Sequence, residues 1–431
     1  AAQMQPHADA DTSHSAWDRK HDEADNGDEW DGDDGDDEDD PSRMGRPYVP
    51  PAAGDGDKVH FGDNVDPSFI VPQRLRDKPY ELIEAANDWH YAMMNDHPRN
   101  DFYKAALKRV ITPESVVLEI GAGSGLLSII AASLGAKRVV AIEANHHLAR
   151  VAQAIVQKNG HEGKVHIINK MSTDISPAEL APYGMPTVLL SEILGTLLLG
   201  ESALHYVEDA RKRLVAPDCA IVPVRGRQFA SLIESKDIES ITSVKGWQGI
   251  DLGWFNTLQD TTSMIFTKQY GFRFSSCAYR TLAPQQQVLD VDFRAATVGM
   301  WRGERRQMLQ ASATGTVHAI MASWEVYDGE GDELVMSTHP QKTLDNFPRD
   351  MQWGQGLQLI EDLAHESDAP TPFRVTEGEW LILVTRFSVD GVTLQFQLER
   401  VDASVPLAMA AKAAANAQAV PAVPVAPQEI N

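Results

Sequence analysis

Short apolar runs alternate with amphipathic stretches between residues 108 and 224, in the order strand, helix, strand. The predicted strands are residues 116–120, 138–142, 165–168 and 187–190, and the predicted helices are residues 126–134 and 148–159. Apolar, β-branched strands of this kind are typical of a parallel sheet covered by helices. The pattern therefore predicts a doubly wound α/β sheet whose ligand binds at the carboxyl ends of the strands.

After Pro223 the pattern changes to short runs rich in β-branched and aromatic residues. The predicted strands are residues 228–233, 264–266, 288–293, 316–326, 380–387 and 392–398. Asp390 and Gly391 separate the last two runs, and an Asp-Gly pair between alternating residues indicates a β-hairpin. These runs predict a mainly antiparallel second domain, either a barrel or a sandwich.

The two ends of the chain lack such patterns. Residues 1–64 hold nineteen acidic and five basic side chains, a net charge of about −14 out of −24 for the whole chain. From residue 403 onward the chain is rich in Ala, Pro and Val without a usable period. We expect an acidic disordered tail over residues 1–66, a ligand-binding domain over 67–222, a β-domain over 223–402 and a second disordered tail over 403–431.

Composition narrows the class of protein. Among its 431 residues the chain has only two cysteines and no apolar run near the roughly 18 residues that cross a bilayer, so we expect an intracellular, reduced protein without a metal site or a membrane partner. The acidic balance argues against direct nucleic-acid binding, which needs clustered Lys and Arg, and favours basic partners. The alternative is that the charge of the tail serves solubility alone.

A glycine-rich turn follows the first predicted strand. Gly121, Gly123 and Gly125 let the backbone approach a ligand closely, and the N–H groups of the next helix point at it. NAD enzymes and S-adenosylmethionine enzymes share this layout, but the dinucleotide pattern needs its third glycine at the position of Leu126. The spacing therefore favours a methyl donor.

Two acidic residues lie beside this turn. Glu143 ends the second strand, where a carboxylate can accept hydrogen bonds from both ribose hydroxyls, and the alternative is an ordinary solvated side chain. Glu119 lies one residue before the end of the first strand, where a charge is costly unless it meets a partner. We expect Glu119 to face the donor.

Two further carboxylates, Glu192 and Glu201, enclose an apolar loop after the strand at 187–190. Chance alone produces many such pairs in a chain with 62 acidic residues, but this one follows a strand end, where ligands collect. Two carboxylates can hold a planar guanidinium by bidentate hydrogen bonds. Because the pKa of arginine is above about 12, positioning and electrostatics must supply most of the catalysis.

Over residues 78–400 the chain resembles the protein arginine N-methyltransferases. The likeness rests on residues 89–100 (WHYAMMNDHPRN), 117–125 (VLEIGAGSG), 141–143 (AIE), 191–202 and 351–355 (MQWGQ). Residues 168–174 (INKMSTD) and 199–204 (LGESAL) are similar to the seventh subtype, the type III enzymes that form monomethylarginine. The resemblance implies a Rossmann-like class I methyltransferase domain followed by a β-barrel domain. It also implies a dimerisation arm, for which residues 236–262 are available unless they are ordinary barrel structure.

The resemblance also implies roles for individual residues. S-adenosylmethionine, with S-adenosylhomocysteine as its product, would be held by His90, Met93, Arg99, Glu119, Gly121, Gly123, Glu143, Met171 and Ser172. In that set Arg99 would pair with the carboxylate of the methionine moiety, Glu143 would hold the ribose, and Met171 and Ser172 would border the adenine. The catalytic set, without a metal, would be Glu192, Glu201, Gln352 and Trp353.

The chain departs from the family pattern at Gln352, where most members have a His. A neutral amide cannot take a proton, which puts a His-dependent step in doubt. A second departure is size, because animal relatives of this subtype are similar to two catalytic modules in tandem, whereas one fits here.

The expected product is omega-monomethylarginine. The expected partners are basic Arg-rich or Arg-Gly-rich proteins such as RNA-binding proteins or histones, and a second copy of the chain in a homodimer. The expected location is the cytoplasm, with the nucleus as a further site. Two alternatives stay open: a methyltransferase acting on a small molecule, which has no use for two glutamates around a cation, and an inactive scaffold that holds basic proteins.

Overall fold

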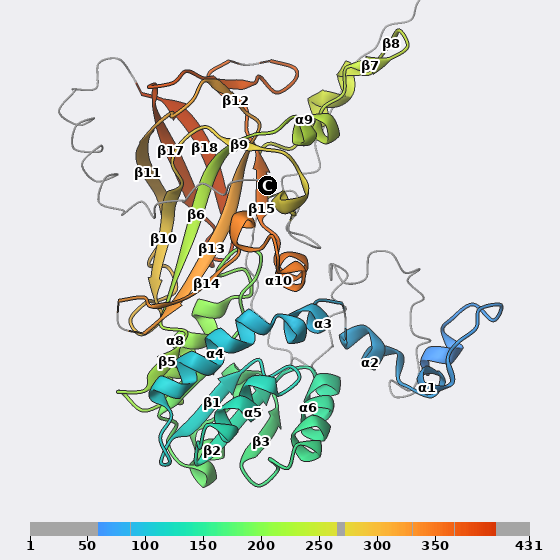
Figure 1. Cartoon of the computed structure of the whole chain (residues 1–431), viewed down its shortest axis with the longest axis vertical. Helices are drawn as coiled ribbons and strands as arrows, with labels where there is room; N and C mark the ends of the chain where they lie inside the picture. The colour runs from blue at the N-terminus through green and yellow to red at the C-terminus, as the bar shows by residue number, and fades with distance from the viewer. Residues whose placement is uncertain (1–58, 87, 265–271, 330, 366, 402–431) are drawn as a thin grey trace, which may run out of the picture. The chain divides into compact units, whose positions relative to one another are not determined.

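Figure 1 shows the computed structural model of the protein, which describes residues 59–86, 88–264, 272–329, 331–365 and 367–401. Residues 1–58 and 402–431, and with them nearly all of both predicted tails, lie outside these ranges. Residues 59–66, which we assigned to the acidic tail, contain the short helix η2 (Phe61–Asp63), because Phe61 stacks on Tyr80 with ring centroids 6.1 Å apart. Among the described residues, no helix is long and apolar enough to cross a bilayer.

The predicted parallel sheet is confirmed. Its strands are β1 (Val116–Ile120), β2 (Arg138–Glu143), β3 (Val165–Asn169), β4 (Val188–Ser191) and β5 (Ala220–Val222), in the spatial order β3-β2-β1-β4-β5. All four pairings are parallel. The strand order reverses between β1 and β4, so a ligand is expected at the carboxyl ends of these two strands.

Helices pack against this sheet. The two helices predicted from the pattern are α5 (Leu126–Ser133) and α6 (His146–Lys158), and shorter segments follow as η3 (Ser172–Asp174), α7 (Pro177–Leu180), η4 (Ala181–Tyr183) and α8 (Ala203–Arg213). The helices before β1 are α1 (Gln73–Arg76), α2 (Tyr80–Ala85), α3 (Asp88–Asn95) and α4 (His97–Val110). The carboxylate of Asp96 caps α4 by accepting a hydrogen bond from the Arg99 N–H, and Pro98 suits the first turn, where no intrahelical N–H bond is needed.

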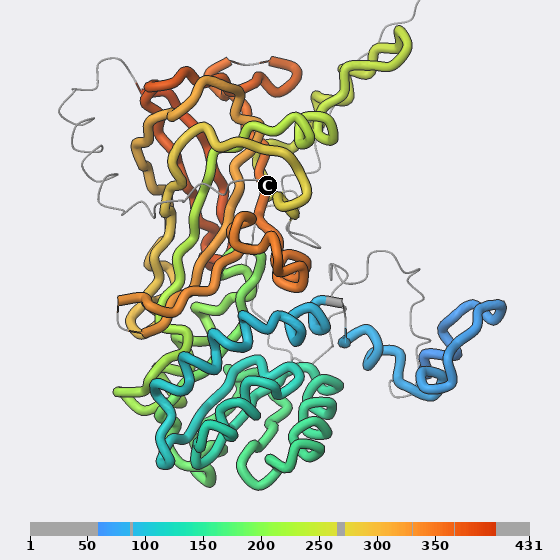
Figure 2. Tube along the Cα trace, viewed as in Figure 1, coloured from blue at the N-terminus to red at the C-terminus, as the bar shows by residue number. Residues whose placement is uncertain are grey.

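The second half of the chain is antiparallel, as predicted (Figures 1 and 2). One sheet contains β6 (Arg225–Glu234), β9 (Arg280–Thr281), β10 (Gln286–Asp292), β13 (Ala319–Asp328), β14 (Leu334–Ser337) and β15 (Gly356–Leu359). Another contains β11 (Gly303–Gln310), β17 (Trp380–Phe387) and β18 (Leu394–Arg400), and β12 (Gly315–Val317) pairs with β16 (Phe373–Val375). Three short helices, η6 (Phe274–Ser276), η7 (Pro340–Lys342) and α10 (Phe347–Gln352), connect these strands. The hairpin at Asp390 and Gly391 is confirmed, with Gly391 at φ +77°.

The structure corrects two predicted strands. The run at 316–326 is divided at His318 into β12 and β13, because these pair with different partners, β16 and β6. In the run at 264–266 only Met264 is described, and it forms an isolated bridge to Gln358.

The segment predicted to be the arm does not join the barrel sheets. It consists of α9 (Lys236–Thr242), the small hairpin of β7 (Gly246–Trp247) and β8 (Ile250–Asp251), and η5 (Gly253–Leu258). In Figure 1 β7 and β8 extend away from the barrel strands. The exposed large apolar side chains of this arm are Ile241, Val244, Trp247, Ile250, Leu252, Trp254, Phe255 and Leu258. Residues 236–262 form no strand of the barrel sheets, although Ile238 at the start of α9 is buried with residues of the barrel strands.

Candidate active site

Three predicted site residues follow neighbouring strands. Gly121 follows β1, Glu143 ends β2 and Glu192 follows β4, so all three lie at the edge where the strand order reverses. Gly121 has φ +74°, and a Cβ there would lie 2.7 Å from the Cγ2 atom of Ile193. A side chain at this position would push the loop after β4 away from the glycine turn.

Glu143 organises the glycine turn. Its carboxylate accepts a hydrogen bond at 2.8 Å from the Gly123 N–H and another at 2.8 Å from the Asn145 N–H. The residue is only 8% exposed, so the alternative of an ordinary solvated side chain is wrong. The Cε atom of Met93 lies 4.0 Å from where a Cβ of Gly123 would be, which brings α3 to the turn.

Glu119 is fully buried at the end of β1, and its partner is a hydroxyl: Ser128 on α5 donates a hydrogen bond to its carboxylate. Burial raises the pKa of Glu119 to about 8, although Ser128 and the charge of Arg99 act in the opposite direction. His90, on α3, is half-buried, and its burial lowers the pKa of the imidazole.

Met171 and Ser172 lie at the start of η3, a few residues after the end of β3. Met171 is exposed, whereas Ser172 is buried and its Oγ has no hydrogen-bond partner among the described residues. A buried hydroxyl without a partner is unfavourable. The predicted donor residues therefore fit a ligand that supplies a polar group at this position.

Arg99 and Glu192 form a buried ion pair. The Nε atom of Arg99 donates to Oε2 of Glu192 at 2.9 Å and its Nη2 atom donates to the same oxygen at 2.5 Å, with both side chains 4% exposed. Burial, the largest single cause, lowers the pKa of Arg99, but the charge and hydrogen bonds of Glu192 together with the nearby Tyr103 and Asp96 outweigh it, so the pKa is raised. We expected Arg99 at the donor and Glu192 at the substrate, and the structure joins the two residues directly.

Glu201 lies at the other end of the loop. The residue as a whole is exposed to solvent, but many protein atoms lie close to its carboxyl group. These surroundings, followed by the negative charge of Glu192, raise the pKa of Glu201 to about 8. A carboxyl in this state gains from the approach of a cation, which favours its ionised form.

Gln352 and Trp353 stand at the end of α10, and Trp353 is bonded to this loop. The indole Nε1 of Trp353 donates to the Leu194 carbonyl at 2.7 Å, and the Thr196 hydroxyl donates to the Trp353 carbonyl at 2.9 Å. Gln352 is half-buried, and its Oε1 has no hydrogen-bond partner among the described residues. Trp353 thus holds the loop, whereas Gln352 keeps an acceptor oxygen available.

Sequence reasoning missed one ion pair of this region. Arg349 on α10 binds Asp96, the cap of α4, through Nε at 2.8 Å and Nη2 at 2.9 Å. Asp96 and Asn346 each stand before a helix with Pro in its first turn, which is a helix-start signal in the sequence. That signal predicts two helix caps, but not a bond between residues 253 positions apart.

Comparisons with known proteins found similar sequences. Residues 96–204 match a family described as ribosomal protein L11 methyltransferase (PrmA). The chain is 33% identical over 296 residues to an arginine N(omega)-methyltransferase of Streptomyces achromogenes subsp. streptozoticus, covering 68% of this chain and 74% of that protein. It is 29% identical over 270 residues to protein arginine N-methyltransferase 7 of Drosophila ananassae, covering 60% of this chain but 39% of the relative.

Solved structures share the fold. A Trypanosoma brucei PRMT1 enzyme-prozyme complex with AdoHcy has a TM-score of 0.59 at 23% identity, covering 73% of this chain and 93% of that one. Protein arginine methyltransferase 10 of Arabidopsis thaliana has a TM-score of 0.57 at 22% identity, covering 75% and 96%. Both likenesses concern the parallel sheet followed by the antiparallel barrel.

Proposed function

This chain belongs to the arginine N-methyltransferase family, and on that premise we propose that it transfers a methyl group from S-adenosylmethionine to a guanidino nitrogen of protein arginine, forming omega-monomethylarginine. One observation carries the proposal: Glu192, at the strand-order reversal, already binds a guanidinium, that of Arg99, by two hydrogen bonds. Glu201, at the other end of the same loop, provides a second carboxylate for a substrate guanidinium.

S-adenosylmethionine, when bound, supplies an electrophilic methyl group. The residues that would hold it are His90, Met93, Arg99, Glu119, Gly121, Gly123, Glu143, Met171 and Ser172. This assignment is supported by the Ser172 hydroxyl, which has no partner among the described residues, and by the glycine turn that Glu143 holds.

The chain's own residues then bind and orient the acceptor. Carboxylates on two sides of a guanidinium fix its plane and draw positive charge toward the bonded nitrogens, which leaves the remaining nitrogen more nucleophilic. Glu201, with a pKa of about 8, can accept the proton that the methylated nitrogen releases. Positioning and electrostatic stabilisation supply the remaining catalysis.

Monomethylation is supported by the similarity to subtype 7 relatives and by the region around Gln352. The Oε1 atom of Gln352, which has no hydrogen-bond partner within the described part of the chain, can accept a hydrogen bond from a substrate N–H. A second transfer requires the methylated arginine to bind again with its next nitrogen toward the donor. Contacts with Glu192, Glu201 and Gln352 leave the guanidinium little freedom to adopt that orientation. We therefore propose that these three side chains together limit the reaction to one transfer.

Basic Arg-rich or Arg-Gly-rich proteins are the proposed acceptors, in keeping with a net charge of −24. Free arginine is the second candidate, because the Streptomyces relative is called an arginine N(omega)-methyltransferase, without reference to a protein acceptor. We also propose a homodimer formed through the arm, whose exposed Trp254 and Phe255 suit a protein interface.

The test incubates the protein with labelled S-adenosylmethionine and an Arg-Gly-rich peptide, or free arginine, and separates mono-, asymmetric and symmetric dimethylarginine after acid hydrolysis. Monomethylarginine in the peptide, lost in Glu192→Gln and retained in the surface variant Glu304→Gln, supports the proposal. Transfer to free arginine alone would establish the second candidate. The absence of transfer to either acceptor would favour a scaffold that holds basic proteins.

A further inference from the structure

Residues 192–201, here named the double-glutamate loop, are held by side chains and backbone of the β-domain. The Leu194 carbonyl accepts from Trp353 Nε1 at 2.7 Å, and the Gly195 carbonyl accepts from Trp324 Nε1 at 2.8 Å. The Leu198 N–H donates to Gln228 Oε1 at 2.8 Å. Three backbone groups of this loop, which follows β4, are therefore hydrogen-bonded to side chains at least thirty residues later in the sequence.

Trp324 and Gln228 form a directly opposed pair on neighbouring strands. Trp324 on β13 is the register partner of Gln228 on β6, so both side chains leave the same face of the antiparallel sheet. Both are fully buried, and the Nε2 atom of Gln228 also donates to the Ser323 carbonyl at 2.8 Å. Each polar group of the pair thus has a specific partner, which fixes its direction.

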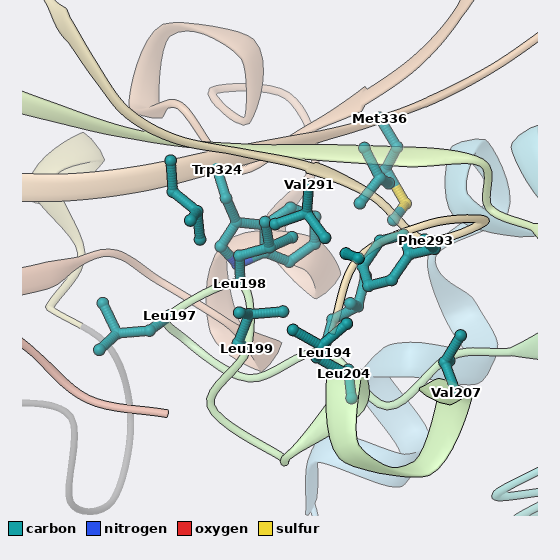
Figure 3. Close-up of a cluster of buried hydrophobic side chains, with 14 of the residues drawn as sticks. Leu194, Leu197, Leu198, Leu199, Leu204, Val207, Val291, Phe293, Trp324 and Met336 are labelled. Atoms are coloured by element: carbon teal, nitrogen blue, oxygen red, sulfur yellow. The ribbon is translucent and has the colours of Figure 1, made fainter. Parts of the chain in front are cut away.

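Apolar packing makes this attachment rigid. Leu194, Leu197, Leu198 and Leu199 of the loop are buried in one cluster with Trp324, as Figure 3 shows. The Trp324 ring also meets the Trp353 ring edge to face, with centroids 4.9 Å apart.

Gly226 on β6 provides the room for Leu198, because a Cβ at Gly226 would lie 2.8 Å from the Leu198 Cδ2 atom. Leucines that fill such a cluster cannot shift along the sheet without opening a cavity. The double-glutamate loop therefore has one position against the β-domain.

We infer that Trp324 and Gln228 are positioning residues that hold Glu192 and Glu201 at the separation needed to bind one arginine guanidinium. This inference rests on the proposed function. The indole N–H fixes the loop just after Glu192, and the amide fixes it just before Glu201. Loosening either bond lets the carboxylates separate, so substrate binding weakens more than donor binding, which the loop reaches through the Arg99–Glu192 bond.

The main test compares Trp324→Phe with Trp301→Phe. The first substitution keeps a large ring in the cluster and removes the N–H. Trp301 is also buried in the core but makes no hydrogen bond to the loop among the described residues, so the second is a control for the loss of a buried indole. We expect Trp324→Phe to raise KM for the Arg-Gly peptide about tenfold, because the buried Gly195 carbonyl loses its hydrogen-bond donor.

Donor binding provides a measurement that does not depend on turnover. The affinity for S-adenosylhomocysteine, from titration calorimetry, should fall by a smaller factor than the peptide KM rises in Trp324→Phe, because the loop meets the proposed donor residues through the Arg99–Glu192 bond, whereas a general loss of structure would lower both equally. Trp301→Phe should leave both the peptide KM and the donor affinity unchanged. An unchanged peptide KM in Trp324→Phe, or an equal rise in Trp301→Phe, would overturn the inference.

Gln228→Met provides a second variant in case Trp324→Phe fails to fold. It keeps the length of the side chain, removes the acceptor of the Leu198 N–H, and should raise the peptide KM by a similar factor. A Gln228→Met protein with wild-type peptide KM would also contradict the inference. If the wild-type protein binds the donor but transfers no methyl group to peptide or arginine, the proposed function fails. That outcome is seen in the wild-type protein, whereas failure of the positioning inference is seen only in the peptide KM of the variants.

Discussion

Arg349 and Asp96 form a buried ion pair that joins α10 to the beginning of α4. The Asp96 carboxylate, 0% exposed, accepts from Arg349 Nε at 2.8 Å and Nη2 at 2.9 Å, and also from Asn346 Nδ2 at 2.9 Å. Arg349 lies on α10 one helical turn before Gln352, so this pair connects the helix that ends at Gln352 to the start of α4.

Removing this cation should destabilise the protein. Arg349→Met leaves the buried carboxylate of Asp96 without its charge partner, so the free energy of unfolding should fall by about 3–5 kcal/mol. Urea unfolding followed by circular dichroism measures the change. The matched control is Arg306→Met at the surface pair Arg306–Glu399, which should cost less than about 1 kcal/mol. Equal losses in the two variants would contradict a special role for the buried pair.

Activity should rise with pH toward about 8. Below its pKa of about 8, Glu201 is neutral and attracts a guanidinium weakly; above it, the carboxylate is charged. Because kcat/KM reports ionisation in the free enzyme, it should increase about tenfold per pH unit below that pKa and level off above it. A pH profile of Glu201→Gln should lack this rise.

Glu119 also has a pKa of about 8, so it needs a separate control. Glu119→Gln should keep the pH dependence of kcat/KM if Glu201 is the group that titrates. Loss of the rise in Glu119→Gln, with the rise kept in Glu201→Gln, would reverse the assignment.

The product should depend on the room around the guanidinium. Glu201→Asp shortens one carboxylate and Gln352→His replaces the amide acceptor, so each should allow some dimethylarginine to form. Amino-acid analysis at exhaustive conversion measures the fraction. Monomethylarginine as the sole product in both variants would show that local space does not limit the reaction.

The Ser172 hydroxyl has no hydrogen-bond partner in the described ranges, so its removal should affect ligand binding but not stability. Ser172→Ala removes no described hydrogen bond of Oγ, so the free energy of unfolding should change by less than about 0.5 kcal/mol. Affinity for S-adenosylhomocysteine, from calorimetry, should fall about fivefold if the hydroxyl contacts the donor. By contrast, Ser128→Ala should lower stability, since its hydroxyl bonds the buried Glu119. Unchanged affinity in Ser172→Ala would remove Ser172 from the donor site.

The arm predicts a defined oligomeric state. Trp254 and Phe255 are 75% and 68% exposed, and burying them against a second copy would remove a large apolar surface from water. Changing both to Ser should convert a dimer into a monomer with an unchanged far-ultraviolet circular dichroism spectrum. Light scattering measures the mass, and a double variant that stays dimeric would exclude this arm as the interface.

Local patterns were sufficient for much of the fold. Apolar runs predicted β1 to β4, because parallel strands are buried on both faces, and Asp390 with Gly391 predicted the β17–β18 hairpin from turn chemistry alone. The polar strand β11 was missed because its arginines and glutamate lack an apolar alternation, and it forms through pairing with β17. Short helices α1 to α3 have too few turns to show a period.

The sequence by itself determined which chemical groups stand at the strand ends: the glycine turn, Glu119, Glu143 and the loop that begins with Glu192. These follow from local rules, because strand ends and glycine positions depend on neighbours in the chain. Only the tertiary structure decided what each group meets. The Arg99–Glu192 bond and the Trp324–Gly195 bond join residues 93 and 129 positions apart. Such partners depend on how the barrel packs against the loop, and the spacing of residues along the chain does not predict that packing.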